Sequence, residues 1–313
     1  LYGGGKISTV SGDLPPVLDE LNFEFDKHGA VDTTGLPVCT PGKLVATDVP
    51  ASRRACGHVV GVARSAGSLE MALGMRFIHS GTTSLAEGVG GADIVVLATP
   101  ITDILEKVRT VGPLLKPGCI LTDVGSTKRA ITQAMEELPP HVEPIGGHPM
   151  CGKETSGLAV ADQALYRDQT YVLSPLPRTA ERTVAIMEAL VRAVGARPLL
   201  LDPERHDRLV AAISHLPYAL AVALVNAAEA MADGDDLAWR LAASGFRDTS
   251  RVAAGDLTMM GDILTTNRDH VLAGLHRAQE QLAALARCLE EDDAEGLQAL
   301  MRAARRRRLE VYG

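Results

Sequence analysis

Residues 92–100, ADIVVLATP, decide the fold of this 313-residue chain. Their continuous apolar, β-branched run, closed by a proline, predicts a strand that is buried on both faces, as strands of parallel sheets are. A second such unit follows, with residues 118–124 as strand, 125–127 as turn and 128–138 as helix. Strands that alternate with helices indicate an α/β domain built on a parallel sheet.

Side chains capable of chemistry follow these strands. Thr99 and Ser126 come at two predicted strand ends, and His148 lies in the stretch 145–157, IGGHPMCGKETSG. Histidine titrates near neutral pH, and glycines let backbone approach a ligand closely, so we expect a catalytic loop here. A surface turn that happens to hold a histidine is the alternative. Ligands of doubly wound sheets bind at the carboxyl ends of strands, so these three residues are expected to converge on one crevice.

Several motifs together resemble the prephenate and arogenate dehydrogenase family. They run in the family's order from about residue 57 to the C-terminus: Thr99-Pro100, DVGSTK at 123–128, GGHPM at 146–150 with Glu154 and Ser156-Gly157, a helix from Asp207 through SHLP at 214–217, and GFRDTSR at 245–251. The resemblance implies a Rossmann-like NAD(P)-binding domain at 57–177 and an all-helical substrate and dimerisation domain at 178–313. It also implies oxidative decarboxylation of prephenate or arogenate to 4-hydroxyphenylpyruvate or tyrosine, in tyrosine biosynthesis.

The resemblance further assigns the chemical roles. His148 would be the base or hydrogen-bond acceptor for the substrate hydroxyl, oriented or assisted by Ser126. Arg251 would pair a substrate carboxylate, for which the bidentate guanidinium is suited. A structural arginine that bridges helices is the alternative for Arg251.

Four more residues are expected to bind the substrate. Glu154 would act as a gate or as an ion-pair partner of Arg251, and Ser214 and His215 lie on a helix expected to face the crevice. A hydrogen-bonded core histidine is the other interpretation of His215. Tyr218 stands where family members often have a second histidine, so prephenate and arogenate both stay open as substrates.

The cofactor is expected to be NAD or NADP. The resemblance implies that this cofactor contacts Thr99, Pro100 and Ser126. At the end of the second strand the chain has Arg64 and Ser65, where NAD-preferring enzymes place an acidic side chain. A cation beside a serine favours the ribose phosphate of NADP, unless Arg64 is an exposed loop arginine unrelated to the cofactor.

The first 56 residues depart from the family. The expected Gly-x-Gly-x-x-Gly positions hold Pro41, Lys43 and Ala46, and the Gly3-Gly4-Gly5 run precedes a strand-like segment, which is the wrong order for cradling pyrophosphate. Residues 13–57 faintly resemble an uncharacterised class of bacterial exported proteins. We therefore expect residues 1–56 to be an atypical segment, foreign or disordered, which leaves the nucleotide-binding domain incomplete. The missing initial methionine is expected to mark a fragment, and the end at Gly313 to leave no regulatory module beyond the helices.

Loss of the first strand would leave a gap in the middle of the sheet. Either residues 43–47 or residues 6–10 are drawn in as a makeshift strand, or residues 1–56 stay detached and the sheet begins at His58. We favour the second outcome, because neither candidate is followed by a glycine turn and a covering helix.

Charge, hydrophobicity and cysteine content argue against nucleic-acid-binding, membrane-spanning and disulfide-rich proteins. A net charge of −8 gives no electrostatic reason to expect nucleic acid or an anionic membrane as partner. No apolar stretch is expected to reach the length of about 20 residues that spans a bilayer. Five scattered cysteines without CxxC spacing suggest neither a metal site nor a disulfide framework, which fits the cytoplasm.

The helical part is expected to form a homodimer. The helix over residues 211–230 is apolar on every face, so it must be buried, and a second subunit usually supplies the extra cover. The alternative to an active enzyme is a catalytically impaired or chimeric chain that acts only as a dimeric scaffold and lacks the glycine-rich cradle.

Overall fold

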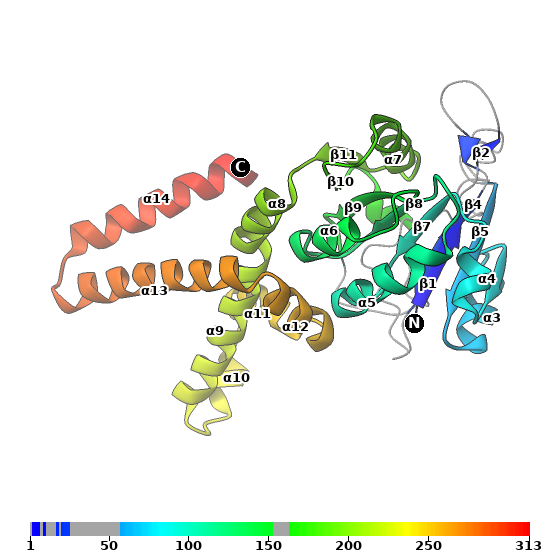
Figure 1. The fold of residues 1–313 in the computed structure, drawn as a ribbon. Coiled ribbons are helices and arrows are strands. Elements are labelled where there is room, and N and C mark those ends of the chain that lie inside the picture. The colour runs from blue at the N-terminus through cyan, green and yellow to red at the C-terminus, as the bar shows by residue number, and fades with distance from the viewer. Residues whose placement is uncertain (1, 7–8, 11–16, 19, 26–56, 153–162) are drawn as a thin grey trace. The chain divides into compact units, whose positions relative to one another are not determined.

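The computed structural model describes residues 2–6, 9–10, 17–18, 20–25, 57–152 and 163–313. The chain forms two compact units (Figure 1). The first, called here the sheet unit, comprises Leu1–Leu209 and Ala254–Asn267, and the second, the helical unit, comprises Val210–Ala253 and Arg268–Gly313. The sheet unit thus continues past residue 178, where the sequence analysis divides the chain.

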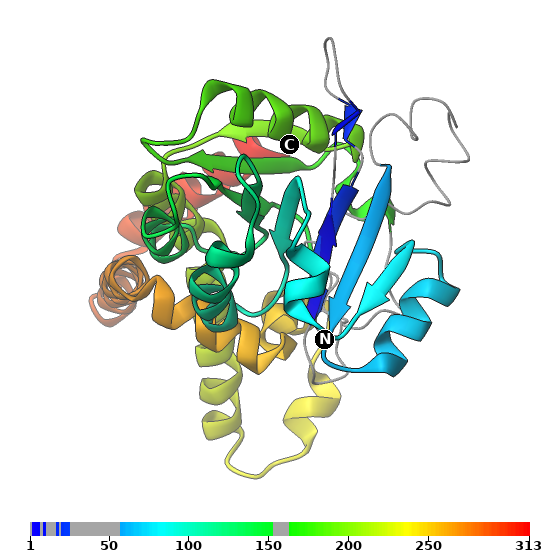
Figure 2. The same cartoon turned by 45° about the vertical axis from the view of Figure 1, so that its right-hand side comes forward.

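A nine-stranded sheet lies at the centre of the described part of the sheet unit, as Figure 2 shows. Its order is β11-β10-β9-β8-β7-β1-β4-β5-β6, with an additional pairing of β7 with β4. The strands are β1 (Tyr2–Lys6), β4 (Glu20–Phe25), β5 (His58–Ala63), β6 (Ser80–Thr82), β7 (Ile94–Leu97), β8 (Ile120–Asp123), β9 (Glu143–Pro149), β10 (Thr170–Pro175) and β11 (Arg197–Leu200). Two short strands, β2 (Thr9–Val10) and β3 (Val17–Leu18), pair with each other.

The predicted buried strands are confirmed. All residues of β7 and of β8 are buried, and the two strands pair in parallel with Ile94 opposite Ile120. A continuous β-branched run suits this position because both faces of the strand are covered.

The amino-terminal residues enter the sheet, which corrects the favoured expectation that it begins at His58. Strand β4 pairs in parallel with β5 and with β7, so it fills the gap in the middle of the sheet. Strand β1 pairs with β4 in the antiparallel direction. Of the two makeshift strands proposed from the sequence, residues 43–47 lie outside the described residues. Residues 6–10 do not form one strand, because Lys6 ends β1, where it pairs with Val95 of β7, while Thr9 and Val10 form β2. An edge that would otherwise be unpaired is thereby closed.

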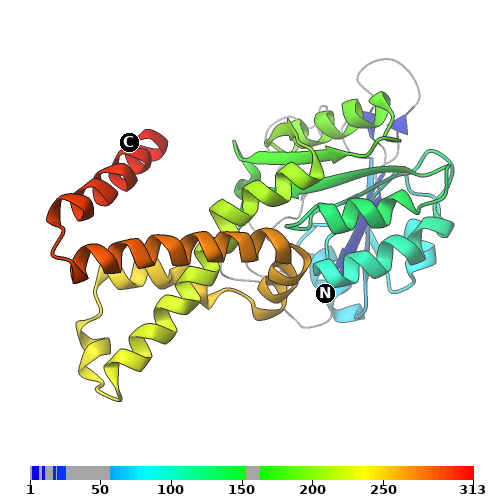
Figure 3. The same ribbon diagram turned by 60° about the vertical axis from the view of Figure 1, so that its left-hand side comes forward.

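Helices follow most of the strands. The sheet unit contains α3 (Ala66–Gly74), α4 (Leu85–Val89), α5 (Ile101–Val111), η1 (Gly112–Leu114), α6 (Arg129–Glu136), η3 (Gln163–Tyr166), α7 (Glu181–Ala193), α8 (Pro203–Val210, except its last residue) and α12 (Leu257–Thr266). The helical unit contains η4 (Ala211–His215), α9 (Leu216–Ala232), α10 (Leu237–Leu241), α11 (Ser244–Ser250), η5 (Arg251–Ala254, except its last residue), α13 (Arg268–Glu290) and α14 (Ala294–Tyr312). Figure 3 shows α13 and α14 as two long successive helices.

Strand β11 pairs in parallel with β10 and forms the far edge of the sheet. One sequence expectation changes two strands further in. The catalytic loop expected around His148 is instead a strand up to Pro149, since β9 pairs with β8 on one side and with β10 on the other. Asp202 caps α8, since its Oδ1 accepts a hydrogen bond from the Arg205 amide at 2.9 Å.

A π turn separates α8 from α9 just before Pro217. Residues Ala211–His215 are π-helical, and Pro217 lies in the first turn of α9. Proline has no amide hydrogen to donate and its ring crowds the carbonyl four residues earlier, so the preceding turn widens.

The long helix Pro203–Ala232 meets the length and composition of a membrane span, since it contains an 18-residue window with a mean hydropathy of 1.7. This corrects the expectation that no stretch is long enough. The same composition also suits a helix covered by protein. Of α9, only Tyr218 and Ala221 are buried; most of its other apolar residues are partly exposed, and Met231 near its end is 85% exposed.

Candidate active site

Three neighbouring parallel strands bring candidate residues to one edge of the sheet. Strands β7, β8 and β9 run in the same direction, so their carboxyl ends meet. Thr99 follows β7, Ser126 follows β8, and His148 is the penultimate residue of β9. These residues therefore lie at one edge of the sheet, and their convergence on one crevice stays a prediction. Ser126 is the only residue of the segment 119–128 that is not fully buried.

A buried ion pair holds the turn that carries Ser126. Asp123 and Lys128 have no exposed side-chain surface, and the Lys128 ammonium pairs with Asp123 Oδ2. The ammonium also donates to the Gly147 carbonyl at 2.6 Å, and Asp123 Oδ1 accepts from the Gly147 amide at 3.0 Å. Burial raises the pKa of Asp123 and lowers that of Lys128, and the attraction between the two charges opposes both shifts. The ion pair thus ties the β8–α6 turn to the residue before His148.

Close packing explains the two glycines before His148. A Cβ at Gly147 would overlap the Asp123 carbonyl oxygen and lie 3.0 Å from the Tyr171 hydroxyl. A Cβ at Gly146 would lie 3.0 Å from Thr132 and 3.2 Å from Lys128. Glycine is required here because the backbone of β9 comes this close to β8 and α6.

A line of hydrogen bonds leads from a buried carboxylate to His148. Asp207 Oδ1 accepts from His206 Nδ1 at 2.7 Å, and His206 Nε2 lies 2.8 Å from His148 Nδ1. Asp207 and His206 are fully buried, whereas His148 is partly exposed. Since a carboxylate only accepts, His206 Nε2 must accept from His148 Nδ1 when both rings are neutral. His148 Nε2 is then the basic nitrogen.

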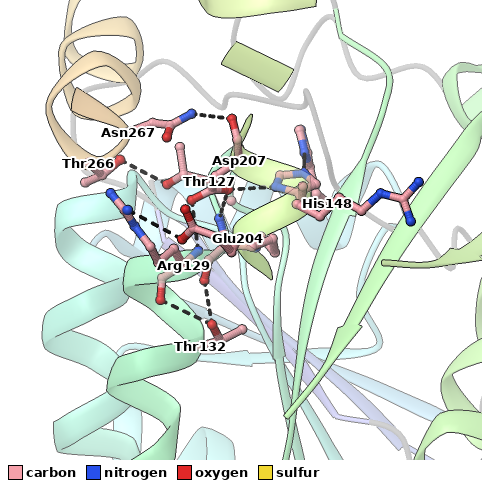
Figure 4. Close-up of polar contacts among 12 residues, drawn as sticks. Thr127, Arg129, Thr132, His148, Glu204, Asp207, Thr266 and Asn267 are labelled. Atoms are coloured by element: carbon pink, nitrogen blue, oxygen red, sulfur yellow. Dashed lines mark hydrogen bonds and ion pairs between the residues drawn. The ribbon is translucent and has the colours of Figure 1, made fainter. Parts of the chain in front are cut away.

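Asp207 also holds the start of α6. Its Oδ1 accepts from the Lys128 amide at 2.7 Å and its Oδ2 from the Arg129 amide at 3.0 Å (Figure 4). Burial alone would raise the pKa of Asp207, but the bonds from His206 and these amides outweigh it and lower the pKa. The carboxylate therefore stays charged and orients His206.

The candidate cofactor residues lie at the carboxyl ends of β5 and β7. Ser65 caps α3, accepting from the Ser68 amide at 3.2 Å. Arg64 is exposed; partial burial lowers its pKa, and the carboxylates of Asp103 and Glu106 act in the opposite direction. Burial raises the pKa of Asp103, and the nearby Thr99 hydroxyl acts in the opposite direction. Pro100 directly precedes α5.

The remaining substrate candidates fall in other parts of the chain. Glu154 lies outside the described residues. Ser214 and Arg251 are exposed, and His215 and Tyr218 are buried, all within the helical unit. The buried position of His215 agrees with a core histidine. In the described part of the chain, no group of three or more His, Cys, Asp or Glu side chains could hold a metal ion.

Sequence reasoning missed His206 and gave Asp123, Lys128 and Asp207 no individual role. A histidine directly before an aspartate, just after the Asp202 cap, was the available signal. Only the fold shows that this pair meets His148, 58 residues away.

Comparisons with known proteins cover most of the chain. The model of the prephenate dehydrogenase nucleotide-binding domain matches residues 50–200, and that of the prephenate dehydrogenase dimerization domain matches residues 202–303. A prephenate dehydrogenase of Bacillus subtilis is 31% identical over 77% of this chain, and the chain spans 65% of its length, just under two thirds.

Two solved structures are similar in both fold and sequence. Synechocystis arogenate dehydrogenase is 31% identical with a TM-score of 0.73, over 89% of this chain and 97% of that one. Prephenate dehydrogenase from Aquifex aeolicus, in complex with hydroxyphenyl propionate and NAD+, is 26% identical with a TM-score of 0.76, over 82% and 89%.

Proposed function

Because this chain belongs to the prephenate dehydrogenase family, we propose that it catalyses the NAD(P)-dependent oxidative decarboxylation of prephenate or arogenate. The observation that carries the proposal is the line of hydrogen bonds from Asp207 through His206 to His148, at the same strand edge as Ser126. Such a line keeps one nitrogen of a partly exposed histidine basic, as proton removal from a hydroxyl requires.

The reaction needs a base at the substrate hydroxyl. The ring carbon that bears the hydroxyl loses hydride, the hydroxyl loses its proton, and the ring carboxylate leaves as carbon dioxide. His148 Nε2 accepts that proton, and the Nδ1 hydrogen bond to His206, backed by Asp207, stabilises the imidazolium that forms. Ser126 orients His148 or the substrate hydroxyl from the neighbouring strand end.

The residues present fit a dinucleotide at its adenosine ribose and at its nicotinamide. Arg64 and Ser65 follow β5, where the adenosine ribose is recognised in such folds, and Thr99, Pro100 and Ser126 follow β7 and β8. When bound, the nicotinamide accepts the hydride. The segment between β4 and β5, where the family has its glycine turn, lies outside the described residues. Arg64 favours NADP, whereas Asp103 and Glu106 nearby offset its charge.

We propose that four residues of the helical unit bind the substrate, with Arg251 on a substrate carboxylate and Ser214, His215 and Tyr218 around the substrate. Glu154, which belongs to the sheet unit, is proposed as a gate or as an ion-pair partner of Arg251. The dimerization-domain match and the partly exposed apolar residues of α9 support a homodimer, and the proposed biosynthetic role fits the cytoplasm.

A second candidate is the dimeric scaffold without activity. It is favoured by Pro41, Lys43 and Ala46, which stand where the family has its glycines. Calorimetric titration with NAD and NADP, followed by turnover assays with prephenate and with arogenate, separates the two. Binding of one nucleotide and reduction of it by either substrate supports the enzyme. No binding of either nucleotide at millimolar concentration would leave only the scaffold.

A further inference from the structure

Helix α12 belongs to the sheet unit, although the chain on both sides of it belongs to the helical unit. Residues Ala254–Asn267 group with the sheet unit, between Val210–Ala253 and Arg268–Gly313. Met260 and Ile263 of this helix are buried, and α12 packs against α5. The α12 segment is therefore part of the packing of the sheet unit.

Polar side chains of α12 bond to three separate segments of the sheet unit. Asp262 Oδ2 accepts from the Thr102 amide at 2.9 Å and from its hydroxyl at 2.8 Å. The Thr266 and Thr127 hydroxyls are 2.9 Å apart (Figure 4).

The third contact comes from the residue that ends the helix. The Asn267 side-chain amide donates to the Asp207 carbonyl at 2.7 Å, and Asn267 is fully buried. Burying an amide is costly unless it is hydrogen-bonded, so this contact strongly favours one position of Asn267 against α8.

Each of these contacts lies beside a residue of the proposed site. Thr102 lies two positions after Pro100, and Thr127 directly follows Ser126. Asp207 orients His206 and through it His148. One helix thus fixes the segments that carry the cofactor contacts, the serine and the histidine relative to one another.

We propose that Asp262, Thr266 and Asn267 are positioning residues. They hold the carboxyl ends of β7 and β8 and the Asp207–His206 pair in the relative positions that catalysis requires. This rests on the proposed function. Reacting groups must be held closely, since a misplacement of about 1 Å costs about 100-fold in rate.

The test compares two adjacent threonines. Thr266→Val removes the hydroxyl that meets Thr127, and Thr265→Val is the matched control. Both hydroxyls also bond to a carbonyl of their own helix, Thr266 to Asp262 at 2.7 Å and Thr265 to Gly261 at 2.8 Å. We expect Thr266→Val to lower kcat by about 10-fold to 100-fold with little change in KM. Thr265→Val should keep the wild-type kcat, and Thr266→Ser should restore it.

A second variant provides a readout that does not depend on turnover. Asn267→Leu removes the contact to Asp207, and the nitrogen chemical shifts of the His148 and His206 rings report on the tautomers of both. We expect these shifts to change in Asn267→Leu and to stay the same in Thr265→Val. An active wild type whose Thr266→Val and Asn267→Leu variants keep its kcat and its ring shifts would overturn the positioning role. If the wild type is inactive but the ring shifts still change in Asn267→Leu, the proposed function is overturned and the positioning role is supported.

Discussion

His148 Nδ1 lies 2.8 Å from His206 Nε2, with the two rings edge to face at 75°. Two adjacent imidazoles resist double protonation, because like charges at this distance repel. The other nitrogen of His206, Nδ1, is hydrogen-bonded to Asp207. A proton gained by the pair during the reaction therefore belongs on the exposed side, at His148.

Replacing His148 by Asn is expected to keep dimerisation and substrate binding. Turnover should fall by about 100-fold to 10,000-fold, the usual contribution of a positioned general base. Steady-state kinetics with the preferred substrate measures the change, and His276→Asn, on an exposed position of α13, is the control. An unchanged kcat in His148→Asn would remove this residue from the mechanism.

Asp207→Asn should destabilise the fold in a pH-dependent way. The pKa of Asp207 is lower in the folded state than in the unfolded chain. Its charge therefore stabilises the fold fully at pH values above the ordinary carboxyl pKa of about 4. This stabilisation is lost as the pH falls through the lowered pKa. We expect the unfolding free energy of the variant to be lower by about 1.5–3 kcal/mol at pH 7. Denaturant titrations at several pH values should show the difference shrinking in acid. A difference that stays constant with pH would contradict this account.

Removing only one charge of the Asp123–Lys128 pair should destabilise the fold more than removing both. Lys128→Met leaves a buried carboxylate without its partner, and breaking such a pair costs about 3–5 kcal/mol of unfolding free energy. The double variant Asp123→Asn, Lys128→Met carries no buried charge, and its loss should be smaller than that of Lys128→Met alone. Equal losses in both would show that the charge itself is not the cause.

Two glycines should respond oppositely to alanine. Gly147→Ala brings a Cβ against the Asp123 carbonyl, so we expect a less stable protein with impaired turnover. Gly67→Ala, in α3, meets nothing within 4 Å and should stabilise the protein by about 0.5–1 kcal/mol. Thermal unfolding of both variants provides the measurement, and a Gly147→Ala protein as stable and active as the wild type would refute the close packing.

The sequence predicts those parts of the fold that local pattern determines. Strands β7 and β8 are long β-branched runs and α8 has a capping aspartate, and all three are found. Strand β9 looks like a loop because its glycines and proline are typical of turns, whereas they are there for tight packing against β8 and α6. Strand β4 carried a signal that was overlooked, since Leu21, Phe23 and Phe25 alternate with polar residues.

The candidate site is predictable only where a residue acts from its own strand end. Ser126 and His148 follow from strand order, because parallel strands end at one edge. His206 and Asn267 do not, since each reaches its partner only after α8 and α12 have packed on the sheet unit. No local pattern encodes contacts across 58 and 60 residues.

Arg251→Gln should mainly weaken substrate binding. A guanidinium that clamps a carboxylate binds the ground state and the transition state about equally, so its loss raises KM and leaves kcat nearly unchanged. A hydrogen bond to a charged group contributes about 1.5–3 kcal/mol, so KM should rise by about 10-fold to 150-fold. Arg247→Gln is the matched control, because Arg247 is equally exposed on the preceding helix and already pairs with Asp248 at 3.2 Å. It should keep the wild-type KM. A fall in kcat at unchanged KM in Arg251→Gln would instead assign this arginine to the chemical step.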